Sequence, residues 1–180
     1  GLDFLWVGAR TTVNPFSVQE VADALKGVNI PVLVKNPVNP DLELWIGALE
    51  RLNRAGITKL AAIHRGFSSF EKGPFRNAPM WDLAIELKTR VPELDIICDP
   101  SHISGNRELI GLISQKALDL DMAGLMIESH LDPDAAWSDA KQQVTPANLA
   151  KIIDGLVVRQ VSSESKTFKD TLSLLRDQID

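Results

Sequence analysis

The sequence lacks several features that mark secreted, membrane-spanning or nucleic-acid-binding proteins. Cys98 is the single cysteine among 180 residues, so no disulfide can form within the chain, as is typical of proteins from a reducing cytoplasm. The formal net charge is -5, whereas a nucleic-acid-binding domain usually carries an excess of basic residues. No apolar run approaches the roughly 18 residues that a membrane-spanning helix needs. These absences predict a cytoplasmic location, with no nucleic-acid partner and no membrane partner.

Two further absences concern the start of the chain and its glycine-containing loops. Residues 1–4 include no initiator methionine, no basic region and no signal-peptide cleavage site, so we expect a piece of a longer protein. The sequence contains neither a Gly-rich dinucleotide fingerprint nor a Walker-type loop. These common nucleotide-binding motifs are therefore excluded.

Short apolar segments of strand length alternate with longer segments of helical periodicity. Strands are expected at Leu2–Val7, Val32–Lys35, Leu60–His64, Ile96–Asp99 and Gly124–Glu128. Helices are expected at Val18–Leu25, Asp41–Ala55, Ala78–Arg90, Arg107–Leu120 and Ala147–Val157. Continuous apolar strands predict burial on both faces, as in a parallel sheet.

Five such β-α units fit two α/β architectures, a doubly wound sheet or part of a (β/α)₈ barrel. A full barrel takes about 250 residues, so these units would be the last five of a partial (β/α)₈ TIM barrel. The barrel fragment is expected to cover residues 1–160, followed by a polar linker at 161–166. Apolar residues at helical spacing then predict a C-terminal amphipathic helix at 167–180, the start of a second domain.

Three cations follow three successive strands, at Arg10, Lys35 and Arg65. The carboxyl ends of parallel strands are where ligands bind in such folds. Three cations in one cleft are costly unless an anion neutralises them, and Arg grips phosphate or carboxylate groups bidentately. The pattern predicts a substrate with phosphate and carboxylate groups. The alternative is that these are surface charges paired with acidic residues.

The next two strands end near His102 and Glu128, and Asp139 lies in the loop that follows. One imidazole and two carboxylates suit a divalent ion such as Mn²⁺, Fe²⁺, Co²⁺ or Zn²⁺, which polarises a carbonyl group as a Lewis acid. Three ligands leave a fourth position for water or another segment. In the alternative interpretation His102 is a turn residue, Glu128 an ion-pair partner and Asp139 a helix cap.

Other polar and aromatic residues near the strand ends are interpreted as mainly structural. Asp99 precedes a proline and is taken as a turn residue, although it is also placed to orient His102. His130 is a candidate to contact substrate from its loop. Packing roles are expected for Cys98, His64, Trp6, Trp45 and Trp81.

In order and spacing, these strand-end motifs resemble those of 3-deoxy-D-arabino-heptulosonate-7-phosphate (DAHP) synthases of the short type I subclass. The matching segments are Val7–Thr12, Val34–Pro37, Ile63–Gly66, Asp99–His102, Met126–His130 and Ser138–Gln143. The resemblance covers residues 2–159. It also extends to the tail at 172–180, which is similar to the first helix of a chorismate mutase domain, with Arg176 at the position of its active-site arginine.

The resemblance implies that Arg10, Lys35, Arg65 and His102 bind substrate, with Lys35 and His102 catalytic. It implies that His102, Glu128 and Asp139 bind the metal ion. The reaction would join phosphoenolpyruvate to erythrose 4-phosphate in a full-length homo-oligomer. The family's fourth ligand, a cysteine, and its Lys-Pro-Arg-Thr segment have no counterpart here, so the fragment is not expected to turn over alone.

Two alternatives to that activity stay open. The related eight-carbon synthase uses arabinose 5-phosphate, but the segments Asp99–His102 and Ser138–Gln143 favour the seven-carbon enzyme. The other alternative is a non-catalytic barrel remnant that acts as a binding or assembly module.

Overall fold

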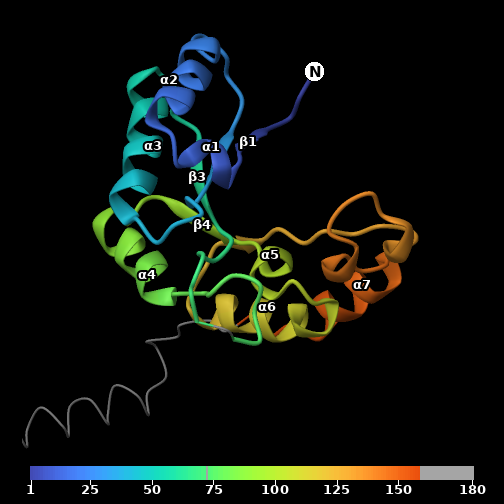
Figure 1. The fold of residues 1–180 in the computed structure, drawn as a ribbon. Coiled ribbons are helices and arrows are strands. Elements are labelled where there is room, and N and C mark those ends of the chain that lie inside the picture. Colours follow the sequence, from blue (N-terminus) through green and yellow to red (C-terminus); the bar gives the residue numbers. More distant parts are fainter. Residues whose placement is uncertain (72, 159–180) are drawn as a thin grey trace, which may run out of the picture.

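The computed structural model describes residues 1–71 and 73–158, which form one parallel five-stranded sheet flanked by helices (Figure 1). The strands are β1 (Leu5–Val7), β2 (Val32–Lys35), β3 (Leu60–His64), β4 (Asp95–Cys98) and β5 (Gly124–Leu125). They lie in the order β1-β2-β3-β4-β5, and every neighbouring pair is parallel. A doubly wound sheet reverses its strand order at a switch point, whereas a barrel does not. The order therefore confirms the partial barrel.

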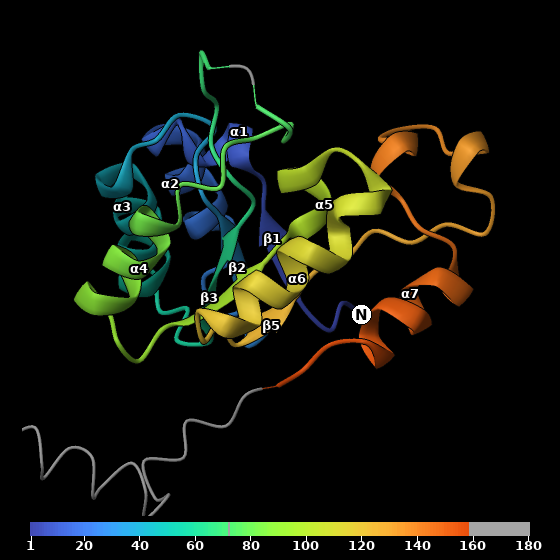
Figure 2. The same ribbon diagram turned by 90° about the horizontal axis from the view of Figure 1, so that it is seen from below.

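The helices connect successive strands. They are α1 (Ala9–Thr12), α2 (Pro15–Ala24), α3 (Leu42–Arg54), α4 (Trp81–Arg90), α5 (Pro100–Ser104), α6 (Ile110–Asp119) and α7 (Pro146–Asp154). Short 3-10 turns are η1 (Arg107–Leu109), η2 (Pro133–Ala135) and η3 (Ala140–Gln142). Helix α3 packs against β2 and β3, α4 against β4 and α6 against β5, and α6 and α7 continue the row of helices (Figures 1 and 2). No helix within the described ranges is long and apolar enough to cross a bilayer.

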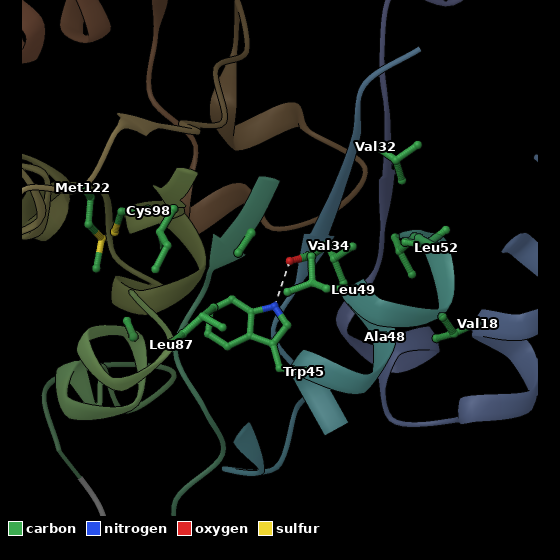
Figure 3. Packing of buried hydrophobic residues seen from close by; sticks show 14 of the residues in the cluster. Val18, Val32, Val34, Trp45, Ala48, Leu49, Leu52, Leu87, Cys98 and Met122 are labelled. Carbon is green, nitrogen blue, oxygen red and sulfur yellow. Dashed lines mark hydrogen bonds between the residues drawn. The ribbon is translucent and has the colours of Figure 1, made fainter. Parts of the chain in front are cut away.

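The core lies between the sheet and its helices (Figure 3). Val32 and Val34 of β2 are fully buried, as is Trp45 of α3. The indole Nε1 of Trp45 donates a hydrogen bond to the carbonyl of Val34 at 3.0 Å, so this polar atom is satisfied within the core. Cys98 is also buried, and burial raises its thiol pKa, which confirms its packing role.

Several element boundaries differ from those predicted. Strand β5 ends at Leu125 and not at Glu128: Met126 donates to the carbonyl of Cys98, the last residue of β4, and the backbone N–H of Glu128 then donates to the Ser101 hydroxyl at 3.0 Å. Helix α4 begins at Trp81, because Ala78 forms an antiparallel bridge with Phe67.

Two single residues near the start of the chain also differ from expectation. Arg10 lies in the short helix α1 directly after β1, not at a strand end. Trp6 is 50% exposed, so its predicted packing role is wrong. The predicted linker at 161–166 and helix at 167–180 lie outside the described residues.

Candidate active site

A cleft of about 310 Å³ opens at the carboxyl ends of the strands. Its lining residues are Trp6, Gly8, Ala9, Arg10, Lys35, Val38, Arg65, Arg76, His102 and Asp139. Five of the six residues predicted from the sequence therefore share one cleft, although they are up to 129 positions apart (139 − 10). The sixth, Glu128, lies beside His102 and Asp139.

Lys35 and Asp99 form a buried ion pair on the floor of this cleft. The Lys35 Nζ donates to Asp99 Oδ2 at 2.8 Å, and the Asp99 side chain is 1% exposed. The other carboxylate oxygen of Asp99 accepts from the backbone N–H of His102 at 3.0 Å, which caps α5. Burial alone raises the pKa of Asp99, but His102 and Lys35 outweigh it and hold that pKa below its usual value. Asp99 is therefore more than the turn residue favoured from the sequence.

Arg65 is buried beside this pair without an acidic partner. Its Nη1 donates to the amide oxygen of Asn77 at 3.1 Å, and its backbone N–H donates to Asn36 Oδ1 at 2.7 Å. Burial lowers the pKa of the guanidinium. Within residues 1–71 and 73–158, neither Arg65 nor Arg10 forms an ion pair. The alternative of surface charges paired with acidic residues therefore fits none of the three, because Lys35 is paired but buried and neither arginine is paired within the described ranges.

His102, Glu128 and Asp139 offer ligand atoms that all lie within 4.8 Å of one another. His102 comes from α5, Glu128 from the segment after β5, and Asp139 from the residue before η3. The Nδ1 atom of His102 lies 2.9 Å from Asp99 Oδ2 but is not aligned for a hydrogen bond. One nitrogen and two carboxylates from three half-buried side chains fit a divalent ion of the predicted kind.

Two residues that the sequence did not single out hold this cluster, Arg76 and Gln142. Arg76 donates from Nη1 to Asp139 Oδ1, and this hydrogen bond is the main reason that the pKa of Asp139 is lowered. Gln142 donates to Glu128 Oε2 at 2.8 Å. Gln142 lies inside the motif at 138–143, which could have pointed to it from the sequence. No sequence pattern pointed to Arg76.

The other two histidines lie outside the cleft. His64 is fully buried among the rings of Trp45, Phe67 and Trp81, which confirms its packing role. Burial lowers its pKa to about 4. His130 is exposed, and its Nδ1 accepts from the backbone N–H of Asp132 at 3.0 Å. The structure therefore does not bring His130 to the predicted substrate position.

The comparisons with known proteins agree on one family. The sequence profile described as the DAHP synthetase I family matches residues 1–165. A phospho-2-dehydro-3-deoxyheptonate aldolase of Thermotoga maritima is 28% identical over 172 residues, which cover 96% of this chain and 46% of the relative. The chain thus spans about half the length of this curated relative.

Two solved structures from Thermotoga maritima have the same fold. A truncated form of DAHP synthase superimposes with a TM-score of 0.71 and 26% identity, over 98% of this chain and 59% of that one. A crystal structure of phospho-2-dehydro-3-deoxyheptonate aldolase gives a TM-score of 0.73 and 27% identity, over 84% of this chain and 43% of that one.

Proposed function

We propose that this chain, which belongs to the DAHP synthetase I family, supplies a substrate-binding cradle and three metal ligands to a DAHP synthase active site. Because the chain covers 46% of its curated relative, the activity of the whole protein is part of the proposal. The main support is the convergence of Arg10, Lys35 and Arg65 with His102 and Asp139 around one cleft.

The proposed reaction condenses phosphoenolpyruvate with erythrose 4-phosphate, the first step of aromatic amino-acid biosynthesis through shikimate. A bond forms between C3 of phosphoenolpyruvate and the aldehyde carbon. Water adds at C2, the bond from C2 to the phosphate oxygen breaks, and inorganic phosphate leaves. Much of the catalysis would come from positioning and from charge neutralisation.

The cations would bind phosphoenolpyruvate, which carries a phosphate and a carboxylate. Arg10 and Arg65 have no acidic partner within the described ranges, so their guanidinium groups remain available for anionic oxygens. Lys35 has a different environment, because Asp99 holds its ammonium group at 2.8 Å. We assign it the role of a fixed point charge beside the enol, since a paired, buried lysine keeps its position without substrate.

His102, Glu128 and Asp139 would hold a divalent ion, Mn²⁺, Fe²⁺, Co²⁺ or Zn²⁺. When bound, such an ion polarises the aldehyde carbonyl as a Lewis acid. Asp99 Oδ2 lies 2.9 Å from Nδ1 of His102, so its negative charge would favour the imidazole of a metal-binding histidine. A cysteine and a Lys-Pro-Arg-Thr segment from elsewhere in the full-length protein would complete the site.

The test is an assay of the full-length protein with both substrates, after EDTA treatment and again after Mn²⁺ is added. We expect metal-dependent release of phosphate and formation of the seven-carbon product. Preference for arabinose 5-phosphate would instead identify the eight-carbon synthase. Absence of turnover together with absence of Mn²⁺ binding would favour the non-catalytic remnant and contradict the proposal.

The proposal also covers the setting of the enzyme. The lone cysteine is buried, which suits a cytoplasmic enzyme. The full-length protein is proposed to be a homo-oligomer, and residues 167–180 to begin a helical domain similar to chorismate mutase. Size-exclusion chromatography and a chorismate mutase assay of the full-length protein test these two points.

A further inference from the structure

Gln142 connects the acidic residues of the cleft although it does not line the cleft itself. Its side chain is almost completely buried at the end of η3. Nε2 donates to Glu128 Oε2 at 2.8 Å, while Oε1 accepts from Arg76 Nη1 at 2.6 Å. Its backbone N–H donates to the carbonyl of Asp139 at 2.9 Å. Gln142 is therefore hydrogen-bonded both to the side chain of Glu128 and to the backbone of Asp139.

The charges on either side fix the orientation of the Gln142 amide. A guanidinium has only donors and a carboxylate only acceptors, so a flipped amide would lose both hydrogen bonds. With the amide fixed, Glu128 Oε2 is held by Gln142, and Oε1 is the oxygen that lies 3.9 Å from Nδ1 of His102. Gln142 thus holds Oε2 of Glu128, while Oε1 is the oxygen that lies nearer to the histidine.

Arg76 is in turn fixed against α5, the helix that carries His102. Its backbone N–H donates to the carbonyl of Ser104 at 3.2 Å. Gly105, at φ +61, allows this approach, because a Cβ at that position would lie 2.5 Å from the Cβ of Arg76. The support of Gln142 by Arg76 is therefore built into the backbone packing.

We propose that Gln142 is a positioning residue that orients Glu128 for metal binding. This inference rests on the proposed function, because it assumes that His102, Glu128 and Asp139 bind a divalent ion. Partners that orient metal ligands typically change metal affinity by about 10–100-fold when they are removed. Removing the Gln142 amide should lower the metal affinity by an amount in that range, since Glu128 would lose its one side-chain hydrogen bond among the described residues.

The test measures Mn²⁺ affinity of the full-length protein by calorimetry for the unsubstituted chain, Gln142→Met and Gln143→Met. Methionine keeps the length of glutamine and removes its donors and acceptors. Gln143 is the matched control, because its side chain donates to the carbonyl of Ser138 in the same loop, whereas that of Gln142 donates to Glu128. We expect affinity to fall by about 10–100-fold in Gln142→Met and by less than about 3-fold in Gln143→Met. Equal losses in the two variants would attribute the effect to a loosened loop and overturn the inference.

Two further variants separate this inference from the proposed function. If His102→Ala binds Mn²⁺ as tightly as the unsubstituted protein, the metal site itself is wrongly assigned. If His102→Ala loses binding but Gln142→Met does not, only the role of Gln142 fails. In a Glu128→Gln background, Gln142→Met should change the Mn²⁺ affinity by less than about 2-fold, because the effects of two substitutions that act through the same contact are not additive. An undiminished effect there would also overturn the inference, and if Gln142→Met fails to fold, Gln142→Leu is measured in the same way.

Discussion

His64 and His102 occupy two very different regions, although both lie close to Asp99. The backbone N–H of Asp99 donates to the carbonyl of His64, and its side chain lies 2.9 Å from the ring of His102. His64 projects into an aromatic layer, where the rings of Trp45, Phe67 and Trp81 surround it and burial lowers its pKa. His102 projects into a cleft with cations and carboxylates. The surroundings of the two imidazoles thus decide their chemistry more than the residue type does.

Two neighbouring residues at the end of β3 show the same contrast. His64 is the last residue of β3 and Arg65 the next, and successive side chains in a strand point to opposite faces. The aromatic layer excludes charge, whereas the cleft holds Arg65 with polar partners alone. Substitutions on the cleft side should therefore change catalysis and metal binding. Substitutions in the aromatic layer should change stability and its dependence on pH.

The largest effect is expected from His102→Ala on the cleft side. Loss of a metal ligand should reduce metal-supported turnover of the full-length enzyme by at least about 10³-fold, since Lewis-acid stabilisation is worth several kcal/mol. His130→Ala is the control, because that exposed histidine lies outside the cleft. Steady-state rates at saturating Mn²⁺ check this, and near-normal activity of His102→Ala would remove His102 from the ligand set.

Asp99→Asn should destabilise the fold, because Asp99 lies between the aromatic layer and the cleft. It leaves the buried ammonium of Lys35 without a charged partner, which typically costs about 3 kcal/mol of unfolding free energy. Urea denaturation of the full-length protein measures this. Asp95→Asn, at an exposed position of β4, is the control and should change stability by less than about 0.5 kcal/mol. Equal stability of the two variants would show that the Lys35–Asp99 pair contributes little.

Arg65→Ala should weaken phosphoenolpyruvate binding and leave the fold largely intact. Loss of a guanidinium that binds an anionic group should raise the Michaelis constant for phosphoenolpyruvate by about 10²-fold. The exposed Arg54, which pairs with Glu50, provides the control Arg54→Ala. An unchanged Michaelis constant and rate in Arg65→Ala would contradict the assignment of this residue to the substrate.

The smallest effect is expected in the aromatic layer, from the titration of His64. Its folded pKa of about 4 lies below the usual 6.5, so the unfolded state binds more protons between these values. Stability should therefore fall as the pH drops from 6.5 toward 4, by roughly 2 kcal/mol at pH 5. His64→Leu should remove this part of the dependence, as urea midpoints from pH 8 to pH 5 would show. Parallel curves for the two proteins would mean that His64 is not buried as a neutral group.

The sequence alone predicted the features that depend on a single segment of the chain. Strands β2 and β3 were predicted residue by residue, because an unbroken apolar run ends at a charged or polar residue. The convergence of Lys35, Arg65 and His102 follows from the parallel order alone. The contact between Arg76 and Gln142 could not be found in this way, because it joins two loops 66 positions apart and depends on how Arg76 packs against Ser104. The early end of β5 likewise depends on the distant hydroxyl of Ser101.

The backbone conformation of Asp139 bears on which residue suits this position. Asp139 has a φ of 54°, a left-handed conformation that glycine adopts without cost and asparagine tolerates well. Backbone conformation alone would therefore favour glycine at this position, by about 1 kcal/mol. The aspartate found here instead supplies a carboxylate that accepts from Arg76 and lies close to His102 and Glu128. Backbone preference and the polar contacts of the carboxylate therefore favour different residues at position 139.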